Sequence, residues 1–298
     1  PPWIKPAHTP PAMTSALLPV AICLMSAISL AATNVLVKRG GDILTSRMVL
    51  SIVMALSVLP FAFFVPLPPR DTWHLIALSM AVHWFYQFSA IRALHRGDLS
   101  LVFPVMRGLG PLATATFAGV VLHEALSVWQ VAGLFAASAA IIVFAMPTGA
   151  TVYARRLDRA ALFWAVMTAL GVGLYAVADA QAVREMPNFL TFVVWLFLID
   201  WIGVTLVALW QRRGGLIKAI RPQIRGGIIA GILGSFSYGL AIFAYTLTDA
   251  AIVTALRETS VVFAAVFGAI LLHEGFGRRR TIAGAVLACG LVLMQAGA

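Results

Sequence analysis

Long apolar runs alternate with short polar connections along the whole chain. A helix that crosses the hydrocarbon core of a bilayer needs about 20 apolar residues, and these runs have that length. The pattern predicts ten spans, over Ala16–Val37, Ile43–Val65, Trp73–Leu94, Ser100–Leu122, Val128–Met146, Ala160–Val183, Phe189–Trp210, Ile228–Leu247, Ala250–Leu272 and Thr281–Gln295. The longest connections, Pro147–Arg159 and Gln211–Arg225, are too short for a folded domain outside the membrane. The predicted fold class is an all-α membrane protein with ten transmembrane helices.

Two stretches of the chain resemble each other. Asp98–Glu124 and Asp249–Glu274 both begin with Asp, continue through an apolar run and end in Leu-His-Glu. A shift of 150 positions aligns Arg107 with Arg257 and also aligns the two tails. Because each half has five spans, an odd number, the second half must cross the membrane in the opposite direction, as in many transporters. The predicted organisation is a flexible lead-in over 1–15 and two inverted five-helix repeats over 16–148 and 149–298.

The composition agrees with a membrane protein. Hydrophobic residues make up 61% of the chain and charged residues 11%, with a mean hydropathy of +0.95. A soluble domain is about 25% charged. The net charge of +10 is spread over short connections, which favours contact with anionic lipid and the cytoplasm over a nucleic-acid surface. Cys23 and Cys289 both lie in apolar spans, which excludes a disulfide scaffold.

The basic residues predict how the chain is oriented. The loops after the odd-numbered spans, with their flanks, contain Lys38, Arg39, Arg47, Arg92, Arg96, Arg155, Arg156, Arg159, Arg212, Arg213, Lys218, Arg221, Arg225, Arg278, Arg279 and Arg280. The opposite side contains Lys5, Arg70 and Arg184. Cytoplasmic loops are enriched in Lys and Arg. We therefore expect the odd-numbered loops in the cytoplasm and both termini in the periplasm.

Several ionisable side chains fall inside the predicted spans, where a charge is costly unless it has a partner or faces water. These candidates for charge pairing or gating are Arg107, Asp179, Asp200, Arg257 and Glu258, and His83 also lies mid-span. In one interpretation they pair with one another and hold helices together. In the other they face a water-filled cavity.

The third predicted span carries a polar stripe. Ser79, His83, Tyr86 and Gln87 are spaced i, i+4, i+7 and i+8, which puts them on one face of a helix. Facing lipid would be unfavourable for these side chains, so the stripe faces either a substrate cavity or neighbouring helices through hydrogen bonds. Adding hydroxyl-bearing residues of the sixth and eighth spans, we predict a substrate-binding cavity lined by His83, Tyr86, Gln87, Tyr175, Ser237 and Tyr238.

The fourth span contains a candidate hinge formed by Gly108, Gly110 and Pro111. Proline removes a backbone hydrogen bond and can bend a helix, so this segment is either a movable hinge beside Arg107 or a fixed kink.

A metal site is not predicted. The pairs His123-Glu124 and His273-Glu274 lack the second histidine of a HExxH motif, and the inverted arrangement puts them on opposite faces. They are interpreted as charges that end helices. Because GxSxG, P-loop and nucleotide-binding motifs are also missing, no cofactor is expected.

With these features the chain resembles the EamA family of the drug/metabolite transporter superfamily. The likeness covers nearly the whole chain through the ten spans, the two repeats and an Asp-containing turn before spans four and nine. The family has a Gly-Glu-Arg-Leu-type run after these spans, where this chain keeps only the Glu in His123-Glu124-Ala125-Leu126 and His273-Glu274-Gly275-Phe276. The mid-span proline of the family is matched by Pro111 but not by Val261. Within the family, the chain resembles the YddG-type aromatic amino-acid exporters.

The resemblance implies an exporter of amino acids, including aromatic ones, or of related small metabolites across the bacterial inner membrane by alternating access. The substrate carboxylate would bind Arg107 or Arg257, and Asp200 or Glu258 would accept its ammonium group or a coupled proton. The expected partners are this small molecule and membrane lipid, without nucleic acid, for a monomer or homodimer. A nucleotide-sugar or drug exporter of the same superfamily is the alternative, followed by a membrane enzyme or a receptor.

Overall fold

The computed structural model describes residues 13–96, 99–146, 158–212, 214–272 and 278–296, and within these ranges all regular structure is helical. The helices run in the order α1 (Met13–Arg39), α2 (Ile43–Val58), η1 (Leu59–Phe63), η2 (Arg70–Thr72), α3 (Trp73–Arg96), α4 (Leu99–Val121), α5 (Val128–Ala145), α6 (Arg159–Glu185), α7 (Phe189–Arg212), α8 (Leu216–Ile220), α9 (Ile224–Tyr245), α10 (Ala250–Arg257), α11 (Ser260–Leu272) and α12 (Arg278–Ala296).

Eight of the ten predicted spans each correspond to one helix, namely α1, α3, α4, α5, α6, α7, α9 and α12. The second predicted span, Ile43–Val65, is divided into α2 and the 3₁₀ helix η1. Pro60 lies at the start of η1 and cannot donate the backbone hydrogen bond that would continue α2. The short helix α8 lies inside the predicted connection Gln211–Arg225 and was not expected from the sequence. The lead-in predicted over 1–15 overlaps α1, which begins at Met13.

The prediction of one continuous helix over Ala250–Leu272 is wrong. The chain ends α10 at Arg257 and begins α11 at Ser260, with a turn at Glu258 and Thr259. At this turn the Val261 amide bonds to the Glu258 carbonyl at 3.0 Å, three residues back, instead of continuing the four-residue pattern. Neither Gly nor Pro stands at the break, so the local sequence carries no signal for it.

The equivalent helix of the first half, α4, is continuous through Pro104 and Pro111. Two of its candidate hinge residues are positions of close packing. A Cβ atom at Gly108 would overlap the side chain of Ile142 on α5, and one at Gly110 would lie 3.2 Å from Val172 on α6. The role of Gly108, Gly110 and Pro111 as a hinge stays a prediction.

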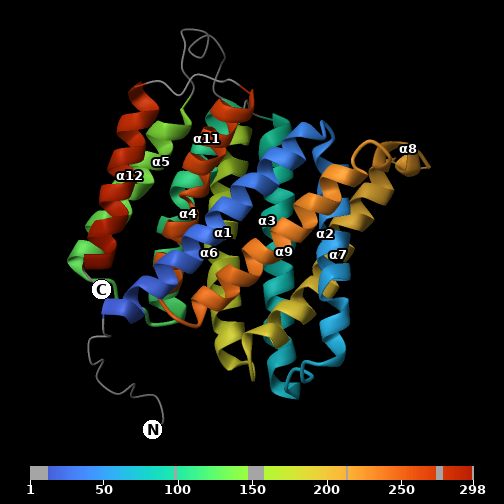
Figure 1. Ribbon diagram of the computed structural model, residues 1–298, viewed down its shortest axis with the longest axis horizontal. Coiled ribbons are helices and arrows are strands. Elements are labelled where there is room, and N and C mark those ends of the chain that lie inside the picture. The colour runs from blue at the N-terminus through green and yellow to red at the C-terminus, as the bar shows by residue number, and fades with distance from the viewer. Residues whose placement is uncertain (1–12, 97–98, 147–157, 213, 273–277, 297–298) are drawn as a thin grey trace.

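The helices form one bundle, in which α1 and α9 cross in front of α3 and α6 (Figure 1). The contacting pairs include α3 with α6, α4 with α6, α1 with α9 and α11, α2 with α7 and α9, and α5 with α12. Eight helical segments in the described part of the chain are long and apolar enough to cross a membrane. Large apolar side chains such as Phe63, Trp210 and Ile232 are exposed on its outside, which suits contact with lipid. The chain is a multi-pass membrane protein.

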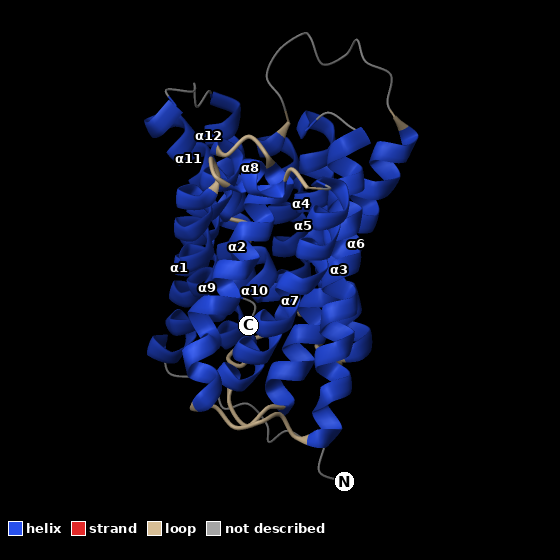
Figure 2. Ribbon diagram, turned by 90° about the vertical axis from the view of Figure 1, so that its right-hand side faces the viewer, coloured by secondary structure: helices blue, strands red, loops and turns tan. Residues whose placement is uncertain are grey.

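The two ends of the bundle are distinct. Figures 1 and 2 show the N-terminus at one end, which we call the lower end, and α8 at the other, the upper end. At the upper end the α1–α2 connection bonds to the end of α7 through Asp42 and Arg212, at 2.6 Å. Burial raises the pKa of the Asp42 carboxyl, but hydrogen bonds from Thr45 together with Arg212 outweigh it, so this pKa is lower than usual. At the lower end, the α4–α5 and α9–α10 connections contact the end of α6 through Arg184.

Candidate functional site

A cavity of about 190 Å³ lies in the middle of the bundle. It is lined from α1, α2, α3, α4, α6, α7, α9, α10 and the turn that follows α10. Its lining residues are Leu30, Thr33, Asn34, Val37, Arg47, Leu50, Ser51, Met54, His83, Tyr86, Gln87, Arg107, Tyr175, Leu196, Phe197, Asp200, Gly234, Ser237, Tyr238, Thr254, Arg257 and Glu258. Both halves of the chain therefore contribute to one polar chamber.

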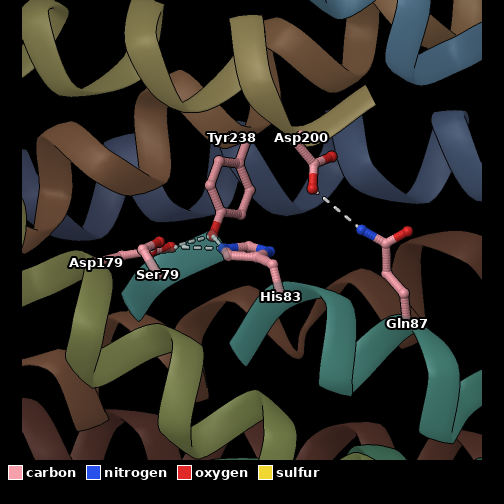
Figure 3. A network of polar contacts seen from close by, with 6 residues as sticks. All are labelled: Ser79, His83, Gln87, Asp179, Asp200 and Tyr238. Atoms are coloured by element: carbon pink, nitrogen blue, oxygen red, sulfur yellow. Dashed lines mark hydrogen bonds and ion pairs between the residues drawn. The ribbon is translucent and has the colours of Figure 1, made fainter. Parts of the chain in front are cut away.

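A hydrogen-bonded cluster lies behind one wall of the cavity, around Asp179 on α6, which is completely buried. Its carboxylate accepts hydrogen bonds from Ser79 and from Tyr238. The Nε2 atom of His83 lies 3.1 Å from the same carboxylate and 3.1 Å from the Tyr238 hydroxyl. Figure 3 shows His83 and Tyr238 pointing toward Asp179 from two different helices. The cluster joins α3, α6 and α9.

A second carboxylate, Asp200 on α7, faces the cavity from the other side of His83 (Figure 3). The Gln87 amide donates a hydrogen bond to it at 3.1 Å. Gln87 is uncharged and does not neutralise this carboxylate. Among the described residues, Asp200 has no ion-pair partner within 4.0 Å. Asp200 can therefore accept a cationic group from a bound molecule.

Two arginines at matching positions of the halves differ in their surroundings. Arg107 on α4 forms an ion pair with Glu258 at 3.2 Å. The Nε atom of Arg257 donates to the Ser26 hydroxyl at 3.1 Å, and its guanidinium carbon lies 5.3 Å from the centre of the Tyr238 ring. Arg257 is 8% exposed, and its terminal nitrogens have no hydrogen-bond partner within the described residues. Arg257 is thus the better placed of the two to bind an anion.

Aromatic rings surround these charges. The His83 ring stacks on Tyr175, with ring centres 4.6 Å apart, and Tyr86 packs edge-on against Tyr175 at 5.2 Å. Such rings offer flat faces to an apolar or aromatic group.

All six predicted substrate-binding residues line the cavity, together with Arg107, Asp200, Arg257 and Glu258. Their role in binding stays a prediction. Asp179 lies behind the wall, where it orients His83 and Tyr238. The Ser237 hydroxyl donates to the Ser26 backbone carbonyl at 2.7 Å, so this bond fastens α9 to α1.

The second half of the chain is similar to a known family. Residues 159–295 match the EamA-like transporter family. The EamA-like segment begins with α6 and ends within α12, so it contains Tyr175, Asp179, Asp200, Tyr238 and Arg257. The members of this family are described as transporters, and a cavity between the EamA-like segment and the first half suits that description.

The fold of the chain is similar to that of a solved structure. A protein solved by crystallography, 16% identical in sequence, superimposes with a TM-score of 0.70 over 95% of this chain and 96% of that chain. A search of curated proteins found no significant match. The two folds therefore agree over nearly the whole length of both chains, and the matched part of this chain includes the EamA-like segment.

Sequence reasoning missed several lining residues. Arg47 was counted among the loop charges, yet it lies one turn into α2 and lines the cavity. Asn34 and Thr33 lie on the last turns of α1, and Thr254 lies on α10. A polar residue inside an apolar run was the available signal for Asn34, but single polar residues carry less weight than a stripe.

The role of Glu124 was also missed, because it was interpreted as a charge that ends a helix. At the lower end its carboxylate pairs with Arg184 at 2.8 Å and accepts the Ala250 amide at 2.9 Å, at the start of α10. Arg184 in turn donates to the backbone carbonyls of Tyr245 and Thr248. We call Glu124, Arg184 and these backbone groups the lower latch. Its counterpart predicted from the sequence, His273-Glu274, lies outside the described residues.

The lower latch should respond to pH. Burial raises the pKa of the Glu124 carboxyl above 4.5, and the guanidinium of Arg184 offsets this only in part. In an opened latch the carboxyl would meet water and regain an ordinary pKa. The closed latch therefore binds the proton more tightly, so it is favoured as pH falls and weakened as pH rises through the raised pKa. Glu124→Gln, which cannot ionise, should remove this pH dependence.

Spin labels at Ala125 and Thr246, on the two connections that the latch holds together, would measure this. Cys23 and Cys289 are first replaced by alanine. We expect the label distances by pulsed electron resonance to lengthen between about pH 5 and about pH 8 in the parent protein. Glu185→Gln, an exposed Glu beside the latch, is the matched control and should keep the response. A parent protein with the same distances at both pH values would contradict the prediction.

Proposed function

We propose that the whole chain is an EamA-type transporter built from two inverted five-helix repeats, 16–148 and 149–298. The packing supports the symmetry. The counterparts in the two halves are α1 and α6, α2 and α7, α3 and α9, α4 and α11, and α5 and α12. Exchanging counterparts turns the α3–α6 contact into α9–α1, the α4–α6 contact into α11–α1, and the α2–α9 contact into α7–α3. All six contacts occur. The α2–α7 and α5–α12 contacts map onto themselves, as a two-fold relation requires.

The proposed activity is export of amino acids, including aromatic ones, by alternating access. The observation that carries it is one cavity that contains an available arginine, an available carboxylate and a group of tyrosines. Arg257 suits the substrate carboxylate, Asp200 suits the ammonium group, and Tyr86 and Tyr175 suit an aromatic side chain. A zwitterion with an apolar side chain satisfies all three features.

The proposed orientation follows from the charges. Figure 1 shows that α1 and α7 end, and α12 begins, at the upper end. These helix ends carry the basic residues Arg39, Arg212 and Arg278–Arg280. Basic connections favour the cytoplasm, so the upper end is assigned to the cytoplasmic side of a bacterial inner membrane and both termini to the periplasm. The cavity includes Val37 and Arg47, near the upper ends of α1 and α2, whereas the lower latch closes the other end. This conformation is therefore interpreted as facing the cytoplasm.

A nucleotide-sugar exporter is the second candidate, because three arginines, Arg47, Arg107 and Arg257, line the cavity. A phosphorylated substrate would use them as phosphate ligands. Glu258 neutralises Arg107, however, and a cavity of about 190 Å³ is small for a nucleotide sugar. The amino-acid exporter remains the better proposal.

Uptake of radiolabelled amino acids into liposomes that contain the purified protein tests the proposal, with a UDP-sugar in the same panel. We expect uptake of phenylalanine above protein-free liposomes, and Tyr175→Ala should lower it about tenfold through loss of aromatic packing. Phe163→Ala is the matched control, since Phe163 lies on the same helix but is 54% exposed on the outside. Failure to transport any amino acid would overturn the proposal, and uptake of the UDP-sugar alone would support the second candidate.

A further inference from the structure

We propose that His83 and Asp179 form a proton-binding site through which transport is coupled to a proton gradient, with protons entering the cell as substrate leaves. This inference rests on the proposed transport function, but it concerns a different part of the cavity wall. The groups that suit the substrate are Arg257, Asp200 and the tyrosines. The histidine–aspartate pair would serve the proton.

The hydrogen bonds define which nitrogen of His83 is free. Asp179 is fully buried and accepts hydrogen bonds from Ser79 and Tyr238, as an ionised carboxylate does. The Tyr238 hydroxyl donates its one hydrogen to Asp179, so its contact with His83 Nε2 assigns the ring hydrogen to Nε2. The neutral ring then keeps its lone pair on Nδ1, which has no hydrogen-bond partner within the described residues. Because His83 lines the cavity, Nδ1 is the position where a proton can be taken up.

Proton uptake at this position is chemically balanced. A hydronium ion in the cavity gives its proton to the Nδ1 lone pair, an N–H bond forms and a water molecule remains. The product is an imidazolium beside the Asp179 carboxylate, so the charge of the pair changes from −1 to zero. A buried carboxylate that orients a histidine and stabilises its cation is a known arrangement in proteins.

Titratable groups face His83 from four other helices. The titratable groups that face it from other helices are Asp179 and Tyr175 on α6, Asp200 on α7, Tyr238 on α9 and Arg257 on α10. Two of these groups are carboxyl groups and one is a guanidinium, so acidic groups outnumber basic groups around the ring. A protonated His83 ring would therefore have more acidic than basic neighbours.

The position of the pair also suggests how the proton could act on transport. His83 belongs to the first half of the chain, while Asp179 and Tyr238 belong to the second. The Tyr238 ring that bonds to the pair also lies against the Arg257 guanidinium. A proton can shift a conformational equilibrium only if it binds one conformation more tightly. A pair that spans both halves can have this property, because its atoms separate when the halves move.

Nitrogen-15 NMR of histidine-labelled protein in micelles tests the pair without reference to transport. The His83 signals are assigned by their loss in His83→Gln, with His74→Gln as a control for an exposed histidine on the same helix. We expect a neutral ring protonated on Nε2 at high pH and a doubly protonated ring at low pH, within about pH 5 to 9. In Asp179→Asn the same ring should change its tautomer or its titration. A His83 ring that stays in one state over this range, or is neutral with hydrogen on Nδ1, would overturn the proposal.

Coupling is tested in liposomes loaded with phenylalanine and a pH-sensitive dye, with a more acidic solution outside. In the parent protein, phenylalanine efflux should be faster with the gradient than without it, and the interior should acidify as phenylalanine leaves. In Asp179→Asn the ratio of the two efflux rates should fall to one, whereas His74→Gln should keep the parent ratio. If the parent protein releases phenylalanine at the same rate with and without the pH gradient, proton coupling is overturned while amino-acid transport is still supported. If no amino acid is transported, the transport proposal fails and coupling fails with it, while the NMR result decides separately whether the pair binds a proton.

Discussion

Replacing Arg257 with glutamine should weaken phenylalanine transport by about 10- to 100-fold. A hydrogen bond between a charged donor and a carboxylate contributes about 1.5 to 3 kcal/mol, and about 1.4 kcal/mol corresponds to a factor of ten. Ser26 and Tyr238 hold the guanidinium in place, so little conformational freedom is lost when a carboxylate binds to it. Glutamine can keep a hydrogen bond to Ser26, but it lacks the positive charge and has one terminal NH₂ group where arginine has two.

The matched control for this prediction is Arg92→Gln. Arg92 lies on α3 with its guanidinium over the Phe88 ring, and it is exposed and outside the cavity. The measurement is the phenylalanine concentration that gives half-maximal uptake into liposomes. Phenethylamine, which lacks the carboxylate, should compete poorly in the parent protein and almost as well as phenylalanine in Arg257→Gln. An unchanged half-maximal concentration in Arg257→Gln, at normal protein levels, would exclude Arg257 as the carboxylate ligand.

The positions of the helices could be predicted from the sequence because each depends on one local property, the length of an apolar run. The break between α10 and α11 could not, since it contains no Gly or Pro. Pro111, which has the strongest breaking tendency, lies within a continuous α4. A helix in a membrane keeps or loses its regular hydrogen bonds according to what its neighbours offer, and those neighbours are distant in the sequence.

The candidate site was predictable where polar residues form a pattern. The stripe on the third span pointed to His83, Tyr86 and Gln87 because several positions agree on one helix face. Asp179 could be recognised as unusual, but not as the centre of a cluster. Glu124 shows most clearly what cannot be predicted from the sequence, because its partners Arg184 and Ala250 lie 60 and 126 positions away along the chain. Pairs of this kind depend on tertiary packing, which a single sequence does not encode as a pattern.

The Arg107–Glu258 pair joins the two halves at the helix break, and its loss should have the largest effect on stability. Breaking a buried ion pair by removing one partner costs about 3 to 5 kcal/mol, because a charge is left without compensation. The two single changes should differ. The side chain of Glu258 is 5% exposed and its Oε2 atom already lacks a hydrogen-bond partner, whereas the side chain of Arg107 is 19% exposed toward the cavity. Arg107→Gln should therefore destabilise the protein more than Glu258→Gln, in which water can reach the remaining charge.

The double variant Arg107→Gln/Glu258→Gln separates the pair from its two members. With both charges removed, no isolated charge is buried, so the double variant should be more stable than Arg107→Gln alone by about 1 to 3 kcal/mol. The measurement is the free energy of unfolding in mixed micelles, from reversible titration with a denaturing detergent. Arg92→Gln/Glu185→Gln, a combination of exposed side chains far apart in the fold, is the control and should show additive effects. If the Arg107 and Glu258 effects were additive too, the two side chains would not act as a pair, and the break between α10 and α11 would have to be held by the backbone and apolar packing alone.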